Sequence, residues 1–367
     1  MKKMANSSII LVIVSVLINS LYAKSSIKVW EKVYEDSKDN KIEAMVKTKD
    51  GGFVVAGWTK SFSNDKSNVY LMKIDGDGNV VWQKVYGGNN VDKAYAITMV
   101  KDGGFMVAGE TRSLGNGRSD IYLMKIDEKG NMLWQRTYGG KKDDRAYAIT
   151  KTKDGGFVVA GYKKSFGNGW SDVYLIKIDE NGNKCWEKTY GGRKDDRAYA
   201  IVDTKDGGCI VAGVTFSFGN GWRDVYVIKM DKYGNIVWQK AYVGSKSDVA
   251  YAITKVKDYG FIMTGWTNSF SHIGNDIFLI EVDENGNTIW QKIYVEGKND
   301  IGFTITKTKE DDSFVVAGWT DSFGNGGIDL YIIKVDGKGN KILERAYGGR
   351  EWNNTHKKHL QFHNTVR

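Results

Sequence analysis

Aspartates recur along this chain at a constant interval, and carboxylates repeated in this way could carry chemistry. Five of them are each 52 residues from the next: Asp92, Asp144, Asp196, Asp248 and Asp300. A ring of carboxylates could hold a metal cation or the cationic group of a ligand. Aspartate also accepts backbone N–H bonds within its own loop. Asp144 and Asp196 are therefore candidate ligand-binding residues, and loop formation is the alternative for the whole series.

Aromatic side chains form a second candidate set, because they vary where the surrounding sequence is constant. In each repeat, one residue directly follows the run Phe-Val-Val-Ala-Gly or its counterpart. From the first repeat to the sixth, this residue is Trp58, Glu110, Tyr162, Val214, Trp266 and Trp319. Trp170 and Trp222 each follow Gly-Asn-Gly in a polar segment. Aromatic rings provide broad apolar contact area and commonly line ligand sites. We predict ligand binding by Trp170, Trp222, Trp58, Tyr162, Trp266 and Trp319, with packing between repeats as the alternative for the last four.

Residue patterns of known catalytic and cofactor sites are missing from the sequence. Three of the four histidines lie between 356 and 363, which leaves His272 alone in the rest of the chain. Neither a Gly-x-Ser-x-Gly elbow nor a His-Glu-x-x-His motif nor a Gly-Lys-Ser/Thr phosphate loop occurs. We therefore expect no catalytic residues, no metal and no cofactor. The alternative is a carbohydrate-active lyase or hydrolase that uses the repeated aspartates.

The elements that must position these residues follow from an internal repeat. Trp30, Trp82, Trp134, Trp186, Trp238 and Trp290 are 52 residues apart, and Leu343 continues the series after 53. Each repeat contains four strand candidates; in the second they are 82–86, 94–97, 105–108 and 120–127. Apolar and polar residues alternate in the first of these, and the third is continuously apolar. No stretch has helical periodicity.

The connections between these strands differ in length. Segments 101–104 and 127–131 contain Asp-Gly or Gly-Asn, as tight hairpin turns do, whereas 87–93 and 111–119 are longer. Hairpins alternate between the two ends of a meander, so both long loops share one end. The predicted fold is all-β: a β-propeller of four-stranded antiparallel blades, with about six blades or an interrupted seven. Ala94 and Ala96 would lie on the inner strand, and the periodic Trp on the outer strand between blades.

Segment 179–186, Asp-Glu-Asn-Gly-Asn-Lys-Cys-Trp, resembles the Asp…Gly…Trp signature of quinoprotein-type (PQQ-like) blades, with one residue fewer between Asp and Trp. The segments 154–161 and 172–175 resemble kelch blades. The DGGFVVAG and DVYLIKID blocks are most similar to secreted bacterial and archaeal propeller repeats, from Ile27 to about Gly349. This resemblance implies a binding role at the cell surface or in the periplasm. It offers no catalytic residues to transfer.

The two ends of the chain differ from the repeats. Lys2 and Lys3, the apolar run 7–21 and Ala23 predict a secretory signal at 1–23, followed by a propeller at 24–349 and an irregular tail at 350–367. The alternative at the N-terminus is an uncleaved anchor, although the apolar run is shorter than the ~20 residues of a spanning helix. We expect a periplasmic or secreted protein without a membrane span after cleavage. The spare strand at 29–34 and a repeat that stops near Asn354 indicate an extra strand or an interrupted seventh repeat.

Charge and cysteine content limit the class of partner. The net charge is +9, and the positive charges of the repeats are interspersed with Asp and Glu, which argues against nucleic acid. Cys185 and Cys209 are predicted to be small buried apolar residues, with a disulfide as the alternative. We expect a monomer that binds an envelope or extracellular protein or a glycan through its long loops. A structural repeat protein of the cell surface is a further alternative.

Overall fold

The computed structural model describes residues 9–11, 32–34 and 40–347, without 62–65, 166–169, 243, 257–259, 271–272, 295–296, 309–310 and 325–326. Its described part consists of strands and their connections and contains no helix. Accordingly, no helix long and apolar enough to cross a membrane is found among these residues. Most of the predicted signal and the whole predicted tail lie outside the described residues. The chain divides into two compact units, unit 1 up to Arg145 and unit 2 from Ala146.

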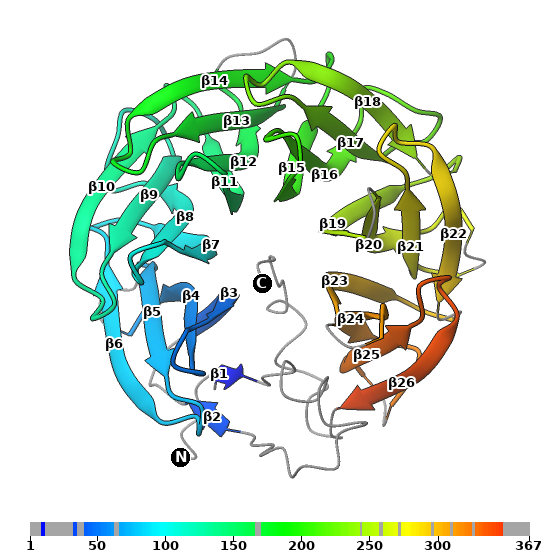
Figure 1. Cartoon of the computed structure of the whole chain (residues 1–367), viewed down its shortest axis with the longest axis horizontal. Helices are drawn as coiled ribbons and strands as arrows, with labels where there is room; N and C mark the ends of the chain where they lie inside the picture. The colour runs from blue at the N-terminus through cyan, green and yellow to red at the C-terminus, as the bar shows by residue number, and fades with distance from the viewer. Residues whose placement is uncertain are drawn as a thin grey trace, which may run out of the picture. The chain divides into compact units, whose positions relative to one another are not determined.

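Unit 1 contains two four-stranded antiparallel blades, in which the strands follow one another in chain order (Figure 1). A short pair of strands, β1 (Ile9–Leu11) and β2 (Lys32–Tyr34), precedes them. Blades 1 and 2 consist of β3 (Asn40–Lys47), β4 (Phe53–Thr59), β5 (Asn68–Ile74) and β6 (Val80–Tyr86), and of β7 (Asp92–Met99), β8 (Phe105–Thr111), β9 (Asp120–Ile126) and β10 (Met132–Tyr138).

Unit 2 contains four blades of the same kind, although β11 takes its first two residues from unit 1. Blades 3 and 4 consist of β11 (Asp144–Lys151), β12 (Phe157–Lys163), β13 (Asp172–Ile178) and β14 (Lys184–Tyr190), and of β15 (Asp196–Asp203), β16 (Cys209–Thr215), β17 (Asp224–Met230) and β18 (Ile236–Tyr242). Blades 5 and 6 consist of β19 (Asp248–Lys255), β20 (Phe261–Thr267), β21 (Asp276–Val282) and β22 (Thr288–Tyr294), and of β23 (Asp300–Lys307), β24 (Phe314–Thr320), β25 (Asp329–Val335) and β26 (Lys341–Tyr347).

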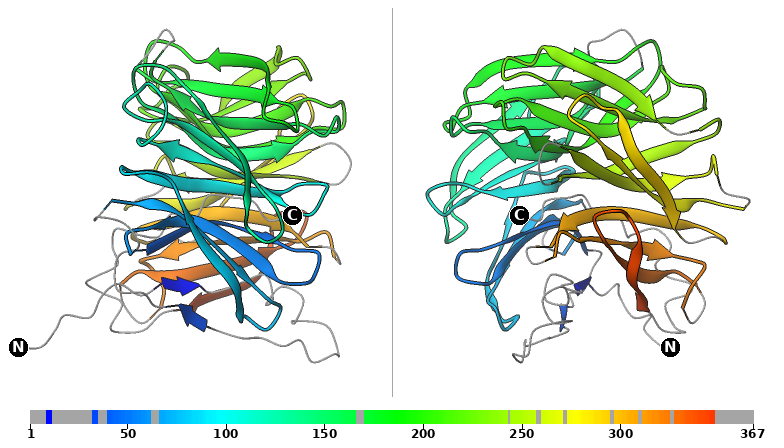
Figure 2. Two further views of the ribbon diagram at one scale, coloured as in Figure 1. Left: turned by 90° about the vertical axis from the view of Figure 1, so that its left-hand side faces the viewer. Right: turned by 45° about the vertical axis from the view of Figure 1, so that its right-hand side comes forward.

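These six blades confirm the predicted fold class, an all-β propeller with four antiparallel strands in each blade. Within unit 2, β15, β19 and β23 are the inner strands of their blades and β18, β22 and β26 the outer ones (Figure 1). Side views show the strands of each blade twisting from the inner to the outer position (Figure 2). The predicted hairpins are also present: Gly155 in the turn between β11 and β12 has φ +89°, a conformation that glycine adopts without strain.

A β-bulge lies on the inner strands β3, β7, β15, β19 and β23, within the predicted alanine face. In blade 4, Ala198 pairs with Gly213 and Ala200 with Ala212, so Tyr199 is the extra residue between two buried alanines. A Cβ atom on Gly213 would lie 1.9 Å from the carbonyl oxygen of Arg197, so only glycine fits opposite the bulge. The bulge places aromatic rings beside the inner strands, where Tyr147, Tyr199, Tyr251 and Phe303 follow one another with centroids 5.3–5.4 Å apart.

The periodic tryptophans pack between neighbouring blades of the same unit, as predicted. The indole of Trp238 on β18 donates a hydrogen bond from Nε1 to the carbonyl oxygen of Glu284 in blade 5, at 2.7 Å. Tyr242, on the same strand, donates to the carbonyl oxygen of Gly286 at 2.8 Å. Trp82 and Trp186 make the equivalent bond to the turn of the next blade. These bonds join the outer strands β6, β14 and β18 to a turn of the next blade.

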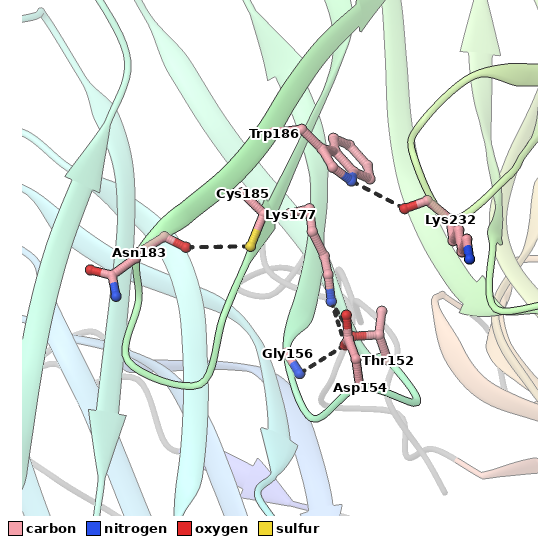
Figure 3. A network of polar contacts seen from close by, with 8 residues as sticks. All are labelled: Thr152, Asp154, Gly156, Lys177, Asn183, Cys185, Trp186 and Lys232. Atoms are coloured by element: carbon pink, nitrogen blue, oxygen red, sulfur yellow. Dashed lines mark hydrogen bonds and ion pairs between the residues drawn. The ribbon is translucent and has the colours of Figure 1, made fainter.

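In five of the six blades a lysine from the third strand pairs with an aspartate of a tight turn, whereas blade 5 has Glu281 at that position. In blade 3, Lys177 donates to Asp154 Oδ1 at 2.7 Å and also bonds Thr152 (Figure 3). Partial burial raises the pKa of Asp154, but the bonds from Lys177, Thr152 and Gly156 outweigh it and hold this pKa at about 2. Because the carboxylate is largely exposed, we assign this pair an orienting effect on the turn rather than a large stabilising energy.

The two cysteines are free thiols, which rules out the disulfide alternative. The prediction that both are buried is wrong for Cys185, which lies on the solvent-facing start of β14 beside Trp186 (Figure 3). Cys209 is buried, and burial raises the pKa of its thiol to about 12. The other five repeats have phenylalanine at this position. A cavity of about 120 Å³ lies beside this smaller side chain and is lined by Cys209, Trp186, Val158 and Lys177, among others.

Cys209→Phe is expected to stabilise the protein by filling this cavity. Cavities cost about 24 cal/mol per Å³, so a phenyl ring that occupied about half of this one would raise the free energy of unfolding by about 1–2 kcal/mol. Urea unfolding followed by far-UV circular dichroism measures the change. Cys185→Ser is the matched control, and its effect should stay within about 0.5 kcal/mol. A destabilised Cys209→Phe variant would show that the cavity does not have the shape of the missing ring.

Candidate functional site

The repeated aspartates at the start of the inner strands are loop anchors. Asp248 is fully buried; it accepts hydrogen bonds from the hydroxyls of Thr267 and Ser269 and from the N–H of Gly244. Burial raises the pKa of Asp248, while the bonds from Ser269 and Thr267 act to lower it. Asp196 has the same three kinds of partner, in Thr215, Ser217 and Gly192.

Asp144, the remaining predicted aspartate, is also fully buried and accepts the N–H of Gly140 at 2.7 Å. The carboxylates of Asp144 and Asp196 thus hold the long loops in place, as the alternative for this series proposed. They present no surface on which a ligand could bind, and we leave them out of the candidate site.

The variable position at the end of the second strand lies in the interior. Trp58, Tyr162 and Trp266 are buried, and Trp319 is half-buried. Tyr162 lies beneath the guanidinium of Arg197, 5.0 Å from ring centroid to Cζ, and Trp266 packs with Val214 and Val249. Packing between repeats therefore accounts for the placement of these side chains. A ligand-binding role for these four residues stays a prediction.

Buried charges in unit 1 were missed by the sequence reasoning. Glu43 and Glu110 are 2% and 1% exposed; Lys41 Nζ lies 3.0 Å from Glu43 Oε1, and Arg145 Nε lies 2.6 Å from Glu110 Oε2. Burial raises the pKa of Glu43, and Lys41 partly offsets this. The available signal was the glutamate at position 43, where the other repeats have Tyr or Phe. These charges compensate one another beneath the surface, so we interpret them as a structural network.

Trp170 and Trp222 are the two predicted residues that the structure places in solvent. Their side chains are 78% and 85% exposed, on the long loops of the neighbouring blades 3 and 4. The backbone N–H of Trp222 donates to the carbonyl oxygen of Lys246 at 3.0 Å. A Cβ atom on Gly221 would lie 1.9 Å from that oxygen, which explains why glycine precedes this tryptophan. The indole is therefore displayed on a loop whose backbone is fixed.

Contacts between loops join the two tryptophans into one surface. Ser171, next to Trp170, donates its hydroxyl to Asp195, and the N–H of Lys194 donates to Ser217 Oγ at 3.0 Å. Ser217 belongs to the loop that carries Trp222, and the N–H of Lys246 donates to Ser269 Oγ at 3.0 Å on the following loop. We define the loop surface of unit 2 by its exposed residues Trp170, Arg193, Lys194, Trp222, Arg223, Lys246 and Lys298.

No family model matches the sequence. A curated protein, the regulatory protein FlaEY of Caulobacter vibrioides, is 25% identical over 134 residues, which are 32% of this chain and 14% of that protein. The matched segment thus spans a small part of that relative.

Several solved structures are similar to this chain, and one of them is a WD40 domain. Sqt1 from Chaetomium thermophilum is 10% identical with a TM-score of 0.51, covering 84% of this chain and 73% of its own. The Pan2 WD40 domain of Neurospora crassa is 11% identical with a TM-score of 0.52, covering 82% and 88%. A protein from Lactobacillus plantarum is 13% identical with a TM-score of 0.52, covering 83% and 84%. At these identities the likeness supports the propeller fold and carries no function.

Proposed function

We propose that this chain is a non-catalytic, exported propeller that binds an envelope or extracellular protein or a glycan through the loop surface of unit 2. The observation that carries the proposal is the exposure of Trp170 and Trp222, at 78% and 85%, on loops joined by hydrogen bonds. Tryptophan and arginine are the residue types that most often dominate binding energies. The backbone at Trp222 is held by its hydrogen bond to Lys246, and such a loop loses little entropy on binding, which favours affinity.

Export in this proposal rests on the predicted signal at 1–23, and a periplasmic or secreted location follows from it. The proposal also takes the protein to act as a monomer. The alternative of a carbohydrate-active enzyme is not favoured, because Asp144, Asp196 and Asp248 are buried and bonded to loop N–H or hydroxyl groups. A purely structural role is the other alternative, and it predicts no ligand for the loop surface.

The double variant Trp170→Ala/Trp222→Ala is expected to weaken partner binding at least 10-fold, since each exposed indole would contribute on the order of 1–2 kcal/mol. Glycan arrays and purified envelope proteins are screened first, and isothermal titration calorimetry then gives the Kd. Tyr233→Ala is the matched control, because Tyr233 is 62% exposed in a tight turn of the same unit. An unchanged Kd for the double variant, or no ligand for the native protein in either screen, would contradict the proposal.

A further inference from the structure

Basic residues occupy equivalent positions on successive loops of the loop surface. Lys194, Lys246 and Lys298 are 52 residues apart, and all three are exposed. Each has its backbone N–H bonded to a serine of the next loop: Ser217 at 3.0 Å, Ser269 at 3.0 Å and Ser322 at 2.9 Å. The repeat thus displays one cation per blade from an anchored backbone. Arg193 and Arg223 add two further cations beside the tryptophans.

The aspartate carboxylates on the same loops are buried or half-buried. Asp196, Asp248 and Asp300 are buried, and each accepts bonds from a Thr and a Ser hydroxyl. Asp195 is half-buried and faces Arg197, with its Oδ1 3.6 Å from Nη2. Among the described residues of the long loops of unit 2, every carboxylate is buried or half-buried. A surface with five exposed cations, and with no exposed carboxylate among the described residues of its loops, attracts a polyanion.

The arrangement of the aromatic residues indicates which class of polyanion fits this surface. Trp170 and Trp222 stand at equivalent positions of the neighbouring blades 3 and 4, so two flat apolar faces lie on the same loop surface as the three lysines. A polysaccharide of acidic sugars has matching features, because its anionic groups recur along the chain and its sugar rings offer C–H faces that pack on an indole. An acidic peptide offers the charge, but aspartate and glutamate provide little flat apolar area.

We infer that the partner of the loop surface is an anionic polysaccharide, recognised by stacking on Trp170 and Trp222 and by ion pairs with Lys194, Lys246 and Lys298. This inference rests on the proposed function and specifies its ligand class. Because exposed ion pairs are screened by salt, binding should weaken as the ionic strength rises. Carboxylate and sulfate groups would both satisfy the lysines, so both kinds of polymer are included in the test.

Biolayer interferometry with the full-length mature protein tests the inference. Probes are polygalacturonate, dextran sulfate, neutral dextran of matched length and polyglutamate. We expect at least one anionic polysaccharide to bind and dextran not to bind. Lys194→Ala/Lys246→Ala/Lys298→Ala should weaken that binding at least 10-fold, and so should Trp170→Ala/Trp222→Ala. The control Lys153→Ala/Lys205→Ala/Lys232→Ala removes the same charge from exposed sites in tight turns of unit 2 and should have less than a 3-fold effect.

Several results would overturn the inference. These are failure of both anionic polysaccharides to bind, equal binding of dextran, or equal loss of binding in the control triple variant. Tighter binding of polyglutamate, lost in the lysine variant and kept in the tryptophan variant, would identify an acidic protein instead. If no anionic polysaccharide binds while the tryptophan variant still weakens another partner, the inference fails and the proposed function stands. Unchanged melting temperatures of the variants would establish that each is folded.

Discussion

Asp248→Ala is expected to lower the free energy of unfolding by about 3 kcal/mol or more. The carboxylate is fully buried, and its removal leaves the hydroxyls of Thr267 and Ser269 and the N–H of Gly244 without their acceptor. A buried donor left unsatisfied costs about 1–3 kcal/mol, and the loss of one partner of a buried charged network typically costs about 3–5. Against a typical total stability of about 5–15 kcal/mol, this change is large.

Urea unfolding monitored by intrinsic fluorescence measures the effect of Asp248→Ala. Glu180→Ala is the matched control, because it removes an exposed carboxylate from a tight turn and should change stability by less than about 0.5 kcal/mol. An Asp248→Ala variant as stable as this control would show that the aspartate does not anchor its loop. Its availability for ligands would then need to be reconsidered, together with that of Asp196.

Trp238→Ala is expected to destabilise the protein by about 3 kcal/mol, near the lower end of the values for truncation of large buried aromatic residues, since this indole is half-buried. The change removes the hydrogen bond to the carbonyl oxygen of Glu284 and the packing between blades 4 and 5. It also leaves space beside Gly286, where a Cβ atom would lie 2.9 Å from the Trp238 ring.

Thermal unfolding by differential scanning calorimetry compares Trp238→Ala with Trp222→Ala. The second variant removes the same residue type from a site that is 85% exposed, so its melting temperature should match that of the native protein. Equal losses in the two variants would contradict the assignment of Trp238 to blade packing and of Trp222 to the surface.

The repeat made most of the fold predictable from the sequence. The 52-residue period located the outer tryptophans, and Asp-Gly turns separated strands of the right length, because both signals are local. The position of Tyr199 was not predictable, since the bulge depends on the pairing of Ala198 with Gly213 and of Ala200 with Ala212. The predicted burial of Cys185 is wrong because the apolar residues at the equivalent position of other repeats, such as Val81 and Leu133, are themselves exposed on the outer strand.

The sequence allowed the exposed tryptophans of the candidate site to be predicted, but not the contacts that join their loops into one surface. Gly-Asn-Gly before Trp170 and Trp222 indicated exposed loops, and exposure is what the structure shows. The continuity of the loop surface depends on contacts between loops about 24 residues apart, such as Ser171 with Asp195 and Lys194 with Ser217. No local pattern specifies such contacts. The burial of Asp144 and Asp196 likewise depends on the loops that fold over them.

Hydroxyl-radical footprinting with mass spectrometry tests the central claim, that the loop surface of unit 2 is the binding face. In the free protein Trp170, Trp222 and Tyr233 should all oxidise rapidly, because their side chains are 78%, 85% and 62% exposed. With the partner at saturation, we predict that oxidation of Trp170 and Trp222 slows several-fold, while that of Tyr233 is unchanged. Undiminished oxidation of both tryptophans in a saturated complex would contradict the claim.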